Sequence, residues 1–378
     1  EKNIFKLNTN ITSFIRNKLR SCPPEINTLQ STRILRQTLP HGIGFHHAGL
    51  LPILKDIVEE LFSQGLIKVL YTTETFAVGI NMPAKTVCFE SLRKFDGFSF
   101  RILNSKEFFQ IAGRAGRRGI DKEGFVYVMV NRRDLDYPKM KSITTEDREP
   151  IRSQFKLSVN TVLNLIQQHN EIEIDKILSM SFHSYQKYGP LYMKKKNVRS
   201  HNAFFKTKKK LEALGYVKNN TLTEKGIFSA KIYADEILLG EIFATDIYKK
   251  FNEYQILLLL GCICFEARER TTFSQRFRTT FLSDLKRAIR SDHYLNKEKR
   301  FEQLDNITAL IHPCYHGSTI FDILKNTNLL EGDLIRIFRQ ILDRIGQIRN
   351  ATTDERLSAM LHNSQTLIID CLKDIDVL

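Results

Sequence analysis

Two arginines spaced three residues apart, Arg114 and Arg117, stand among glycines in the run from Gln110 to Gly119. A guanidinium presents a rigid fork of donors that matches phosphate oxygens two hydrogen bonds at a time. The neighbouring glycines allow backbone to approach a ligand closely. Arginines in such a pattern can neutralise the charge on a phosphoryl group during its transfer. The alternative interpretation is a basic helix end on a solvated surface.

Two further motifs lie upstream of the arginines. The adjacent His46 and His47 follow a glycine-containing apolar run, and no third ligand is spaced to complete a metal site with them. They predict a loop after a strand in which backbone N–H groups and a histidine contact a phosphate, or else a buried histidine satisfied by backbone. Thr72 and Thr73 follow a predicted strand, and hydroxyls at a strand end suit phosphate binding. Gly79 would permit close approach to a nucleotide or to another domain.

The elements that would position these motifs alternate between strands and helices. Apolar runs at 67–71, 86–89 and 125–130 predict strands, and the apolar spacing of 53–62 predicts a helix. Near-continuous apolar strands between helices indicate a parallel sheet covered on both faces. Loops at the strand ends of such a sheet carry ligands.

The rest of the chain predicts two more domains. A polar, charged segment at 134–150 marks a boundary, and short helices follow it. A helix that ends at Gly215, followed by a short hairpin, is the layout of a winged helix. From residue 234 onward the pattern is helical. The predicted fold is therefore multidomain, α/β followed by all-α, with a parallel-sheet domain at 1–145, a winged helix with a short basic insertion at 146–233 and a helical bundle at 234–378.

Composition points to an anionic partner. The formal net charge is +15 over 378 residues, which favours a nucleic acid. The six cysteines show no recurring C-x-x-C pair and are expected to be small buried side chains in a reducing compartment. No apolar run is long enough to span a bilayer and residues 1–20 lack a signal-peptide core. We therefore expect a soluble, intracellular protein with no membrane partner.

Taken in order, the motifs resemble the second RecA-like domain of superfamily 2 helicases. G-I-G-F-H-H-A-G-L, T-E-T-F-A-V-G-I-N-M-P-A and Q-I-A-G-R-A-G-R-R-G carry this resemblance, which is specifically to the superkiller-type DExH-box RNA helicases that feed the RNA exosome. The stretch at 94–97 is typical of the same group. Residues 155–165 and 222–226 resemble the start and close of the family's winged helix, and 330–336 resembles part of its C-terminal bundle.

The resemblance implies a role for each matching residue. Arg114 and Arg117 would be catalytic arginine fingers on the ATP γ-phosphate. The helix that begins near Glu331 would track single-stranded nucleic acid through Arg336 and Arg339, unless it is a bundle helix with a solvated basic face. The hairpin-like piece 93–101 sits where related helicases part the strands, and its Phe95 and Phe98 are expected either to stack on a base or to pack in the core. The nucleotide would be bound by Gln110, Gly79 and Gly113, and the nucleic-acid backbone by His47, Gly49, Thr73, Glu74 and Asn81.

Two parts of an ATP site are missing from this sequence. It contains neither a G-x-x-x-x-G-K-[S/T] loop nor a D-E-x-H motif. We expect both, together with the Mg²⁺ that accompanies ATP, to belong to a first RecA-like domain upstream. The first strand of the second domain is also expected to precede residue 1, so this fragment alone should not hydrolyse ATP. Only a basic stretch at 186–210 occupies the place of the long arch of exosome-linked relatives, which indicates an arch-less member.

The sequence leaves the substrate and the activity open. The main hypothesis is a 3′-to-5′ RNA helicase whose partners are single-stranded RNA, the first RecA-like domain and RNA-decay machinery. A repair-type DNA helicase shares the fold and the arginine motif. A nucleic-acid-binding or assembly module without motor activity is a third hypothesis. A purely structural α/β protein does not account for three ordered motifs.

Overall fold

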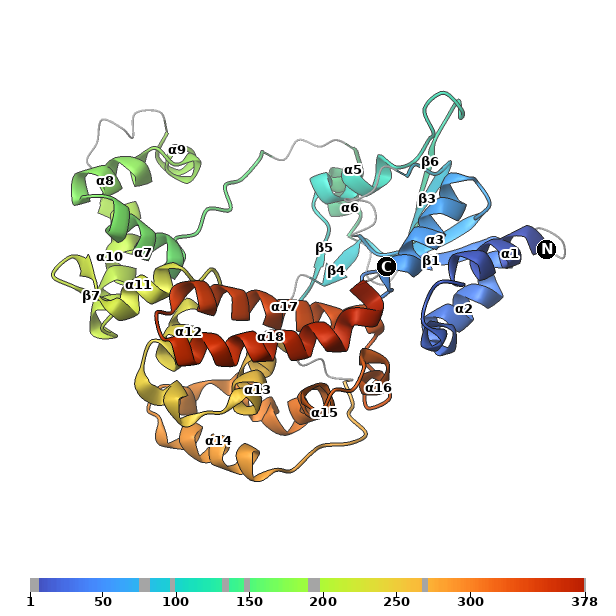
Figure 1. The fold of residues 1–378 in the computed structure, drawn as a ribbon. Coiled ribbons are helices and arrows are strands. Elements are labelled where there is room, and N and C mark those ends of the chain that lie inside the picture. Colours follow the sequence, from blue (N-terminus) through green and yellow to red (C-terminus); the bar gives the residue numbers. More distant parts are fainter. Residues whose placement is uncertain are drawn as a thin grey trace. The chain divides into compact units, whose positions relative to one another are not determined.

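The structure is a computed structural model, and it describes residues 7–74, 82–95, 99–130, 136–145, 150–189, 198–266 and 271–376. The chain divides into two compact units, residues 1–151 and residues 152–377 (Figure 1). Each unit is described by itself. The predicted boundaries of three domains remain a prediction.

Unit 1 begins with helices and continues with alternating strands and helices. The predicted helix at 53–62 is confirmed, because apolar Leu54, Ile57, Val58 and Leu61 all point into the core of the unit. The first two helices are separated at Pro23 and Pro24, where a 3₁₀ turn begins. The helices are α1 (Thr9–Lys18), α2 (Gln30–Thr38), α3 (Pro52–Ser63), α5 (Ser105–Ala112) and α6 (Tyr137–Thr145), with the 3₁₀ helices η1 (Pro24–Thr28) and η2 (Leu39–His41).

The strands of unit 1 form parallel pairs and one antiparallel hairpin. The three predicted strands are present, and each begins within two residues of its predicted start. β1 pairs with β2 and β3 with β6 in parallel, while β4 and β5 are antiparallel. The strands are β1 (Ile43–His46), β2 (Val69–Thr72), β3 (Thr86–Phe89), β4 (Arg93–Phe95), β5 (Phe100–Ile102) and β6 (Phe125–Val128).

The expectation of one parallel sheet covered on both faces is wrong for the described strands. They form two separate parallel pairs, and apolar side chains of β2 and β6 are exposed, among them Tyr71 and Tyr127. Their apolar pattern indicates burial on both faces, but no described element covers these side chains. Cys88, which lies in β3, is exposed, contrary to the expectation for the cysteines. The other five cysteines are buried as expected.

In the described residues of unit 2, the strands form one hairpin and the other elements are helices. The first part of unit 2 runs as three short helices, a long helix, the hairpin and a further helix, of which the short helices, the long helix and the hairpin were predicted from the sequence. The elements are α7 (Val159–Gln168), α8 (Glu171–Ser179), α9 (Phe182–Tyr188), α10 (Val198–Ala213), β7 (Val217–Lys218), β8 (Thr221–Leu222) and α11 (Glu224–Ala230).

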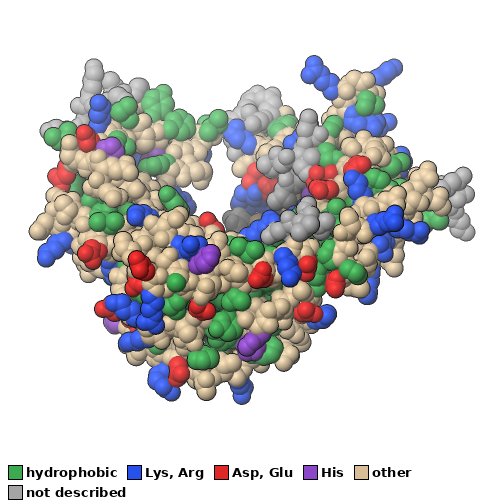
Figure 2. Space-filling model, in the orientation of Figure 1, with side chains coloured by type: hydrophobic (Ala, Val, Ile, Leu, Met, Phe, Trp, Pro, Cys, Tyr) green, Lys and Arg blue, Asp and Glu red, His purple; other side chains and the backbone are tan. Residues whose placement is uncertain are grey.

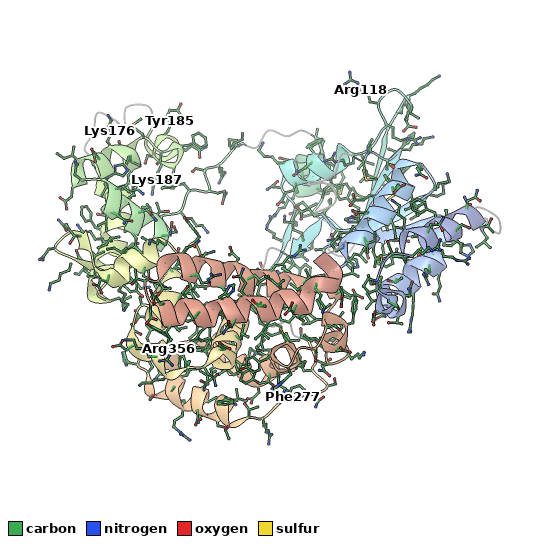
Figure 3. All side chains as sticks on the ribbon, in the orientation of Figure 1. Arg118, Lys176, Tyr185, Lys187, Phe277 and Arg356 are labelled. Carbon is green, nitrogen blue, oxygen red and sulfur yellow. The ribbon has the colours of Figure 1, made fainter. Side chains whose placement is uncertain are left out.

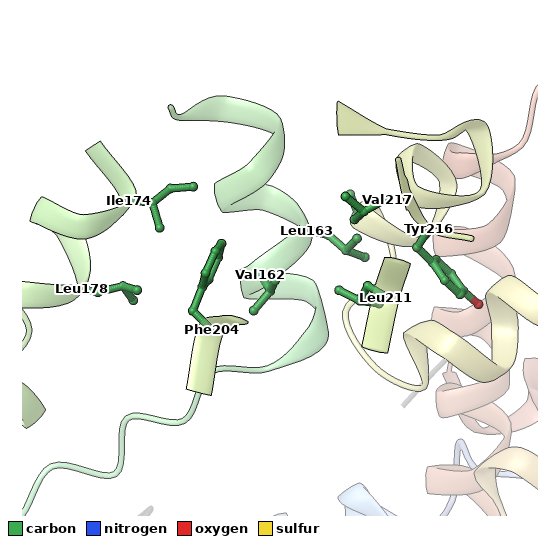
Figure 4. Packing of buried hydrophobic residues seen from close by; sticks show 9 residues of the cluster. Val162, Leu163, Ile174, Leu178, Phe204, Leu211, Tyr216 and Val217 are labelled. Carbon is green, nitrogen blue, oxygen red and sulfur yellow. The ribbon is translucent and has the colours of Figure 1, made fainter. Parts of the chain in front are cut away.

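One buried cluster joins these elements (Figure 4). Tyr216, at the start of the hairpin, is fully buried, and its hydroxyl donates to the carbonyl of Ile237 at 2.9 Å. Asn219 and Asn220 form the hairpin turn with φ of 50° and 63°, which is the geometry that two-residue turns prefer and that asparagine tolerates. The cluster comprises Val162, Leu163, Ile174, Leu178, Phe204, Leu211, Tyr216, Val217 and Ala230.

Replacing Gly226 with alanine should destabilise unit 2. A Cβ at this position would lie 2.1 Å from the backbone oxygen of Tyr216, so α11 would have to move away from the hairpin. We expect Gly226→Ala to lower the free energy of unfolding by about 3 kcal/mol, measured by urea denaturation followed by circular dichroism. Gly346→Ala is the matched control, because Gly346 has open space around it and alanine in a helix interior should stabilise by about 1 kcal/mol. An equal response of the two variants would contradict the packing argument.

The remainder of unit 2 packs around one helix that is almost entirely buried. Every residue of α13 from Tyr254 to Cys264 is buried, and α13 contacts α15, α17 and α18. Gly261 permits the close crossing with α15, since a Cβ there would lie 2.7 Å from Ile307. The helices are α12 (Glu236–Phe243), α13 (Glu253–Cys264), α14 (Thr280–Ser291), α15 (Leu304–Tyr315), α16 (Ile320–Leu324), α17 (Glu331–Ala351) and α18 (Glu355–Asp376), with η4 (Asp246–Lys250), η5 (Leu295–Lys297) and η6 (Lys299–Gln303).

Candidate nucleotide and nucleic-acid site

The two arginines of the candidate site lie in a loop that follows α5. The helix starts with a capping box, in which Asn104 accepts from the N–H of Glu107 while the Glu107 carboxylate accepts from the N–H of Asn104. After α5 the loop runs beside Ala84, whose N–H donates to the carbonyl of Arg114 at 2.9 Å. Gly116, with φ of +88°, packs against the backbone of Gly124. This glycine is therefore required by backbone packing within the loop.

The guanidinium of Arg117 is held by Asp121. Nε donates to Oδ2 at 2.7 Å and Nη2 to Oδ1 at 2.8 Å, while the N–H of Arg117 also donates to Oδ2 at 3.0 Å. Hydrogen bonds from Arg117 lower the pKa of Asp121 to about 2, and the same pairing raises the pKa of Arg117. The carboxylate thus fixes one edge of the guanidinium. Sequence analysis missed Asp121, although its spacing of four residues from Arg117 was a usable signal.

The neighbouring Arg118 has a different environment. Figure 3 shows it at the tip of the loop between α5 and β6, pointing away from the fold, and Figure 2 shows Lys and Arg side chains projecting there. Arg118 is exposed, whereas Arg114 and Arg117 are half-buried. Of the residues predicted to bind nucleotide, Gln110 is exposed on α5 and Gly113 ends that helix. The arginine loop thus contains two side chains held near the protein and one in solvent.

The two histidines after β1 differ in what they contact. His46 is buried, as one of the two interpretations expected, but the partner of its Nε2 is the Glu59 carboxylate at 2.8 Å and not a backbone group. His47 stacks on Phe45, and its Nδ1 accepts the N–H of Gly49 at 3.1 Å. Nδ1 is therefore an acceptor, so the neutral ring carries its proton on Nε2. The N–H of Gly49, predicted to contact nucleic acid, is used inside the loop.

The loops after β1 and β2 lie at one sheet edge. The parallel register pairs His46 with Thr72, and the N–H of Thr73 donates to the carbonyl of His46 at 3.3 Å. His47 and Thr73, which are both predicted to bind nucleic acid, therefore leave the sheet side by side. Residues 75–81, including Gly79 and Asn81, lie outside the described residues.

An ionic network connects this edge to α5. Lys94 of β4 lies opposite Arg101 of β5 in the hairpin register. The Nζ of Lys94 lies 2.8 Å from Glu74 Oε1 and 2.7 Å from Glu107 Oε1. Arg101 donates to both oxygens of Glu107, at 2.6 and 2.8 Å. Glu74, predicted to lie along the nucleic acid, therefore has its carboxylate paired with Lys94.

Two members of the network, Glu107 and Lys94, keep their charges over a wide pH range. Hydrogen bonds from Arg101, ahead of those from Lys94 and Asn104, lower the pKa of Glu107 to about 2. Burial opposes the charge on Lys94, but its bonds to Glu107 and Glu74 outweigh burial and raise its pKa. Because the Glu107 pKa is depressed, its stabilising contribution is present above pH ~4.5 and is lost as the pH falls toward 2.

The opposite face of the hairpin is aromatic. Phe95 and Phe100 are register partners with ring centroids 5.4 Å apart, and 57% and 69% of their surfaces are exposed. Successive strand residues alternate between faces, so this pair lies on the face away from Lys94 and Arg101. Core packing, one of the two expectations for Phe95, is therefore wrong. Phe98 lies outside the described residues, and sequence analysis missed Phe100.

In unit 2, the predicted helix start at Glu331 is confirmed by α17. Arg336 and Arg339 are exposed on its surface. Arg336 lies 3.7 Å from Glu266 and 3.9 Å from Asp333, so it is only loosely paired. The opposite face of α17, with Phe338 and Ile341, is buried. The helix therefore presents a basic surface that is anchored by an apolar one.

Two features are absent from the described residues. Within those ranges, no group of three or more His, Cys, Asp or Glu side chains could hold a metal ion. Nor is any helix in the described part of the chain long and apolar enough to cross a membrane.

Two stretches of the chain match known protein families. Residues 16–119 match the family described as "Helicase conserved C-terminal domain", and residues 219–369 match the "DSHCT (NUC185) domain". The chain is 50% identical over 150 residues to the human "Exosome RNA helicase MTR4" (40% of this chain, 14% of the relative).

Two other relatives give similar coverage. Identity is 42% over 181 residues to "mRNA transport homolog 4" of Caenorhabditis elegans (48% of this chain, 17% of the relative). It is also 42% over 177 residues to "Antiviral helicase SKI2" of Saccharomyces cerevisiae (47% and 14%). The match spans less than a fifth of each relative's length. Over the matched stretches the chain is therefore similar to Ski2-like superfamily 2 helicases.

Proposed function

We propose that this chain is part of an ATP-dependent RNA helicase that moves 3′ to 5′. ATP and Mg²⁺ would be held mainly by a first RecA-like domain that carries the phosphate loop and the magnesium carboxylate. The match to RNA helicases named for the exosome and for antiviral action supports single-stranded RNA as substrate and RNA-decay machinery as partner. Such a protein would work inside the cell.

One observation carries the proposal. Asp121 binds the Nε and Nη2 edge of Arg117, and no described residue hydrogen-bonds to Nη1. A guanidinium oriented on one edge and available on the other can meet a phosphate without a large conformational search. The exposed apolar strands β2 and β6 give separate support, because a further part of a longer protein would cover them.

The remaining parts have roles consistent with this proposal. Residues 146–233 would form the winged helix and residues 234–378 the bundle, and together they would close around a single strand. Only the basic stretch 186–210 stands where related helicases carry a long arch, which favours an arch-less member. Each ATP cycle would close the cleft, bring Arg114 and Arg117 to the γ-phosphate, and reopen after hydrolysis, while the loops at His47 and Thr73 grip successive phosphates.

The full-length gene product provides the test. It should hydrolyse ATP faster with single-stranded RNA present and should unwind a duplex that has a 3′ RNA overhang. In competition, an RNA overhang should be preferred to a DNA overhang of the same sequence. Preference for DNA would favour the repair-type alternative, and absence of any ATPase would favour a binding module without motor activity. A parent sequence without a phosphate loop upstream of Glu1 would also refute the proposal.

Arg336 and Arg339 should contribute phosphate contacts. In the full-length protein, Arg336→Ala and Arg339→Ala should each weaken single-stranded RNA binding several-fold and reduce the slope of log affinity against log salt by about 0.7. Arg356→Ala is the matched control, since Arg356 is an exposed arginine of the same unit (Figure 3). Fluorescence anisotropy at several salt concentrations measures both quantities. If all three variants behave alike, the assignment of α17 is wrong.

A further inference from the structure

The β4–β5 hairpin pairs two positively charged side chains, which lowers its stability unless negative charges compensate them. Lys94 and Arg101 lie directly opposite each other across the two strands. Like charges at such positions repel. Both are nevertheless held in place, because the carboxylates of Glu74 and Glu107 lie within 2.6–2.8 Å of their nitrogens. The hairpin therefore depends on two acidic residues from outside it.

These two carboxylates come from different functional elements. Glu74 follows Thr73, and the N–H of Thr73 donates to the carbonyl of His46 just after β2. Glu107 lies in the first turn of α5, where its carboxylate also caps the helix. Lys94 bridges the two through one ammonium group, and its side chain is 24% exposed. A shift of either element must stretch or break a bond to Lys94.

The helix α5 extends this connection to the arginine loop. It is eight residues long, about 12 Å, and ends immediately before the loop with Arg114 and Arg117. Its backbone hydrogen bonds make it a rigid rod on this length scale. Movement of the arginine loop toward a nucleotide therefore displaces Glu107 and, through it, the hairpin.

We propose that Lys94 and Glu107 are positioning residues that couple the arginine loop to the nucleic-acid loop and to the hairpin. When α5 moves, the face of the hairpin that carries Lys94 and Arg101 moves with it. The opposite face, with Phe95 and Phe100, then moves against the nucleic acid. Closure of the nucleotide cleft is thereby converted into displacement of the hairpin. The inference rests on the proposed helicase function and adds to it the residues that transmit the movement.

The test uses the full-length protein and measures three quantities: basal ATPase, RNA-stimulated ATPase, and base pairs unwound per ATP. Lys94→Gln and Glu107→Gln remove a charge each. Glutamine at position 107 still caps α5, so the helix start is retained. We expect basal ATPase within about twofold of wild type, and at least about a fivefold loss both of RNA stimulation and of base pairs unwound per ATP.

The double variant and a control separate coupling from general damage. Lys94→Gln with Glu107→Gln should be no worse than either single variant, because both break the same connection. Lys141→Gln, an exposed lysine on α6, should leave all three quantities unchanged. Additive losses, equal losses of basal and stimulated ATPase, or unchanged unwinding per ATP would each overturn the coupling. A wild-type protein without RNA-stimulated ATPase would instead refute the proposed function.

Discussion

Replacing Arg117 with alanine should abolish unwinding by the full-length protein and lower its turnover of ATP by roughly 10³-fold or more, the range that removal of an arginine finger produces. The physical reason is that the guanidinium supplies positive charge only where negative charge develops on the transferring phosphoryl group. Binding of single-stranded RNA should be nearly unchanged, because Arg117 lies in the loop after α5 and not in the loops after β1 and β2. Steady-state ATPase and fluorescence anisotropy with labelled RNA measure the two effects. Equal losses of hydrolysis and RNA binding would remove Arg117 from the catalytic group.

Arg118→Ala is the matched control for this variant. It removes the same charge from the adjacent position, but its side chain points into solvent at the tip of the loop. ATP turnover should stay within about threefold of wild type, as expected of an exposed surface charge.

Asp121→Asn tests how the finger is oriented. The asparagine keeps the shape of the side chain but loses the carboxylate that holds Nε and Nη2 of Arg117. Turnover should fall by about tenfold with little change in the KM for ATP, since orientation matters most in the transition state. Combined with Arg117→Ala, the substitution should have no further effect. A further loss in the double variant would show that Asp121 acts independently of the arginine.

Local patterns predicted the elements of the fold better than the way they assemble. The helix at 53–62 and the strands at 86–89 and 125–130 were identifiable because hydrophobic spacing depends only on neighbours in the chain. The apolar pattern of β2 and β6 predicted a fully covered sheet, yet their side chains are exposed. The apolar residues of a strand indicate that both of its faces are covered in the folded protein, but they do not indicate which polypeptide segment covers them.

The same limit applies to the site. Arg114 and Arg117 stand in a motif of fixed spacing and could be recognised from the sequence. The bond between Lys94 and Glu74 joins residues twenty positions apart. The pairing of Lys94 with Arg101 depends on the register between two strands of three residues each. No periodicity predicts such contacts. The capping box at Asn104 and Glu107 was the one local signal for the start of α5.

The exposed aromatic pair of the hairpin gives the second large expected effect. Replacing Phe95 and Phe100 together with alanine should lower the rate of duplex unwinding by the full-length protein about tenfold or more. An aromatic ring stacked on a base contributes roughly 1–3 kcal/mol, and this face of the hairpin is open to receive one. ATPase stimulated by single-stranded RNA should change little, because the ionic face of the hairpin, with Lys94 and Glu107, is untouched.

Two additional variants determine whether stacking is the cause. Leucine at both positions keeps an apolar side chain of similar bulk but lacks a π face, so it should unwind nearly as slowly as alanine if the rings stack on bases. Tyr137→Ala, which removes an exposed aromatic side chain of the same unit, should unwind at the wild-type rate. A duplex assay with a 3′ RNA overhang, followed in real time by strand separation, compares all four proteins. If the leucine variant unwinds at the wild-type rate, the rings act as an apolar wedge without base stacking, because bulk alone would then be sufficient to hold the strands apart.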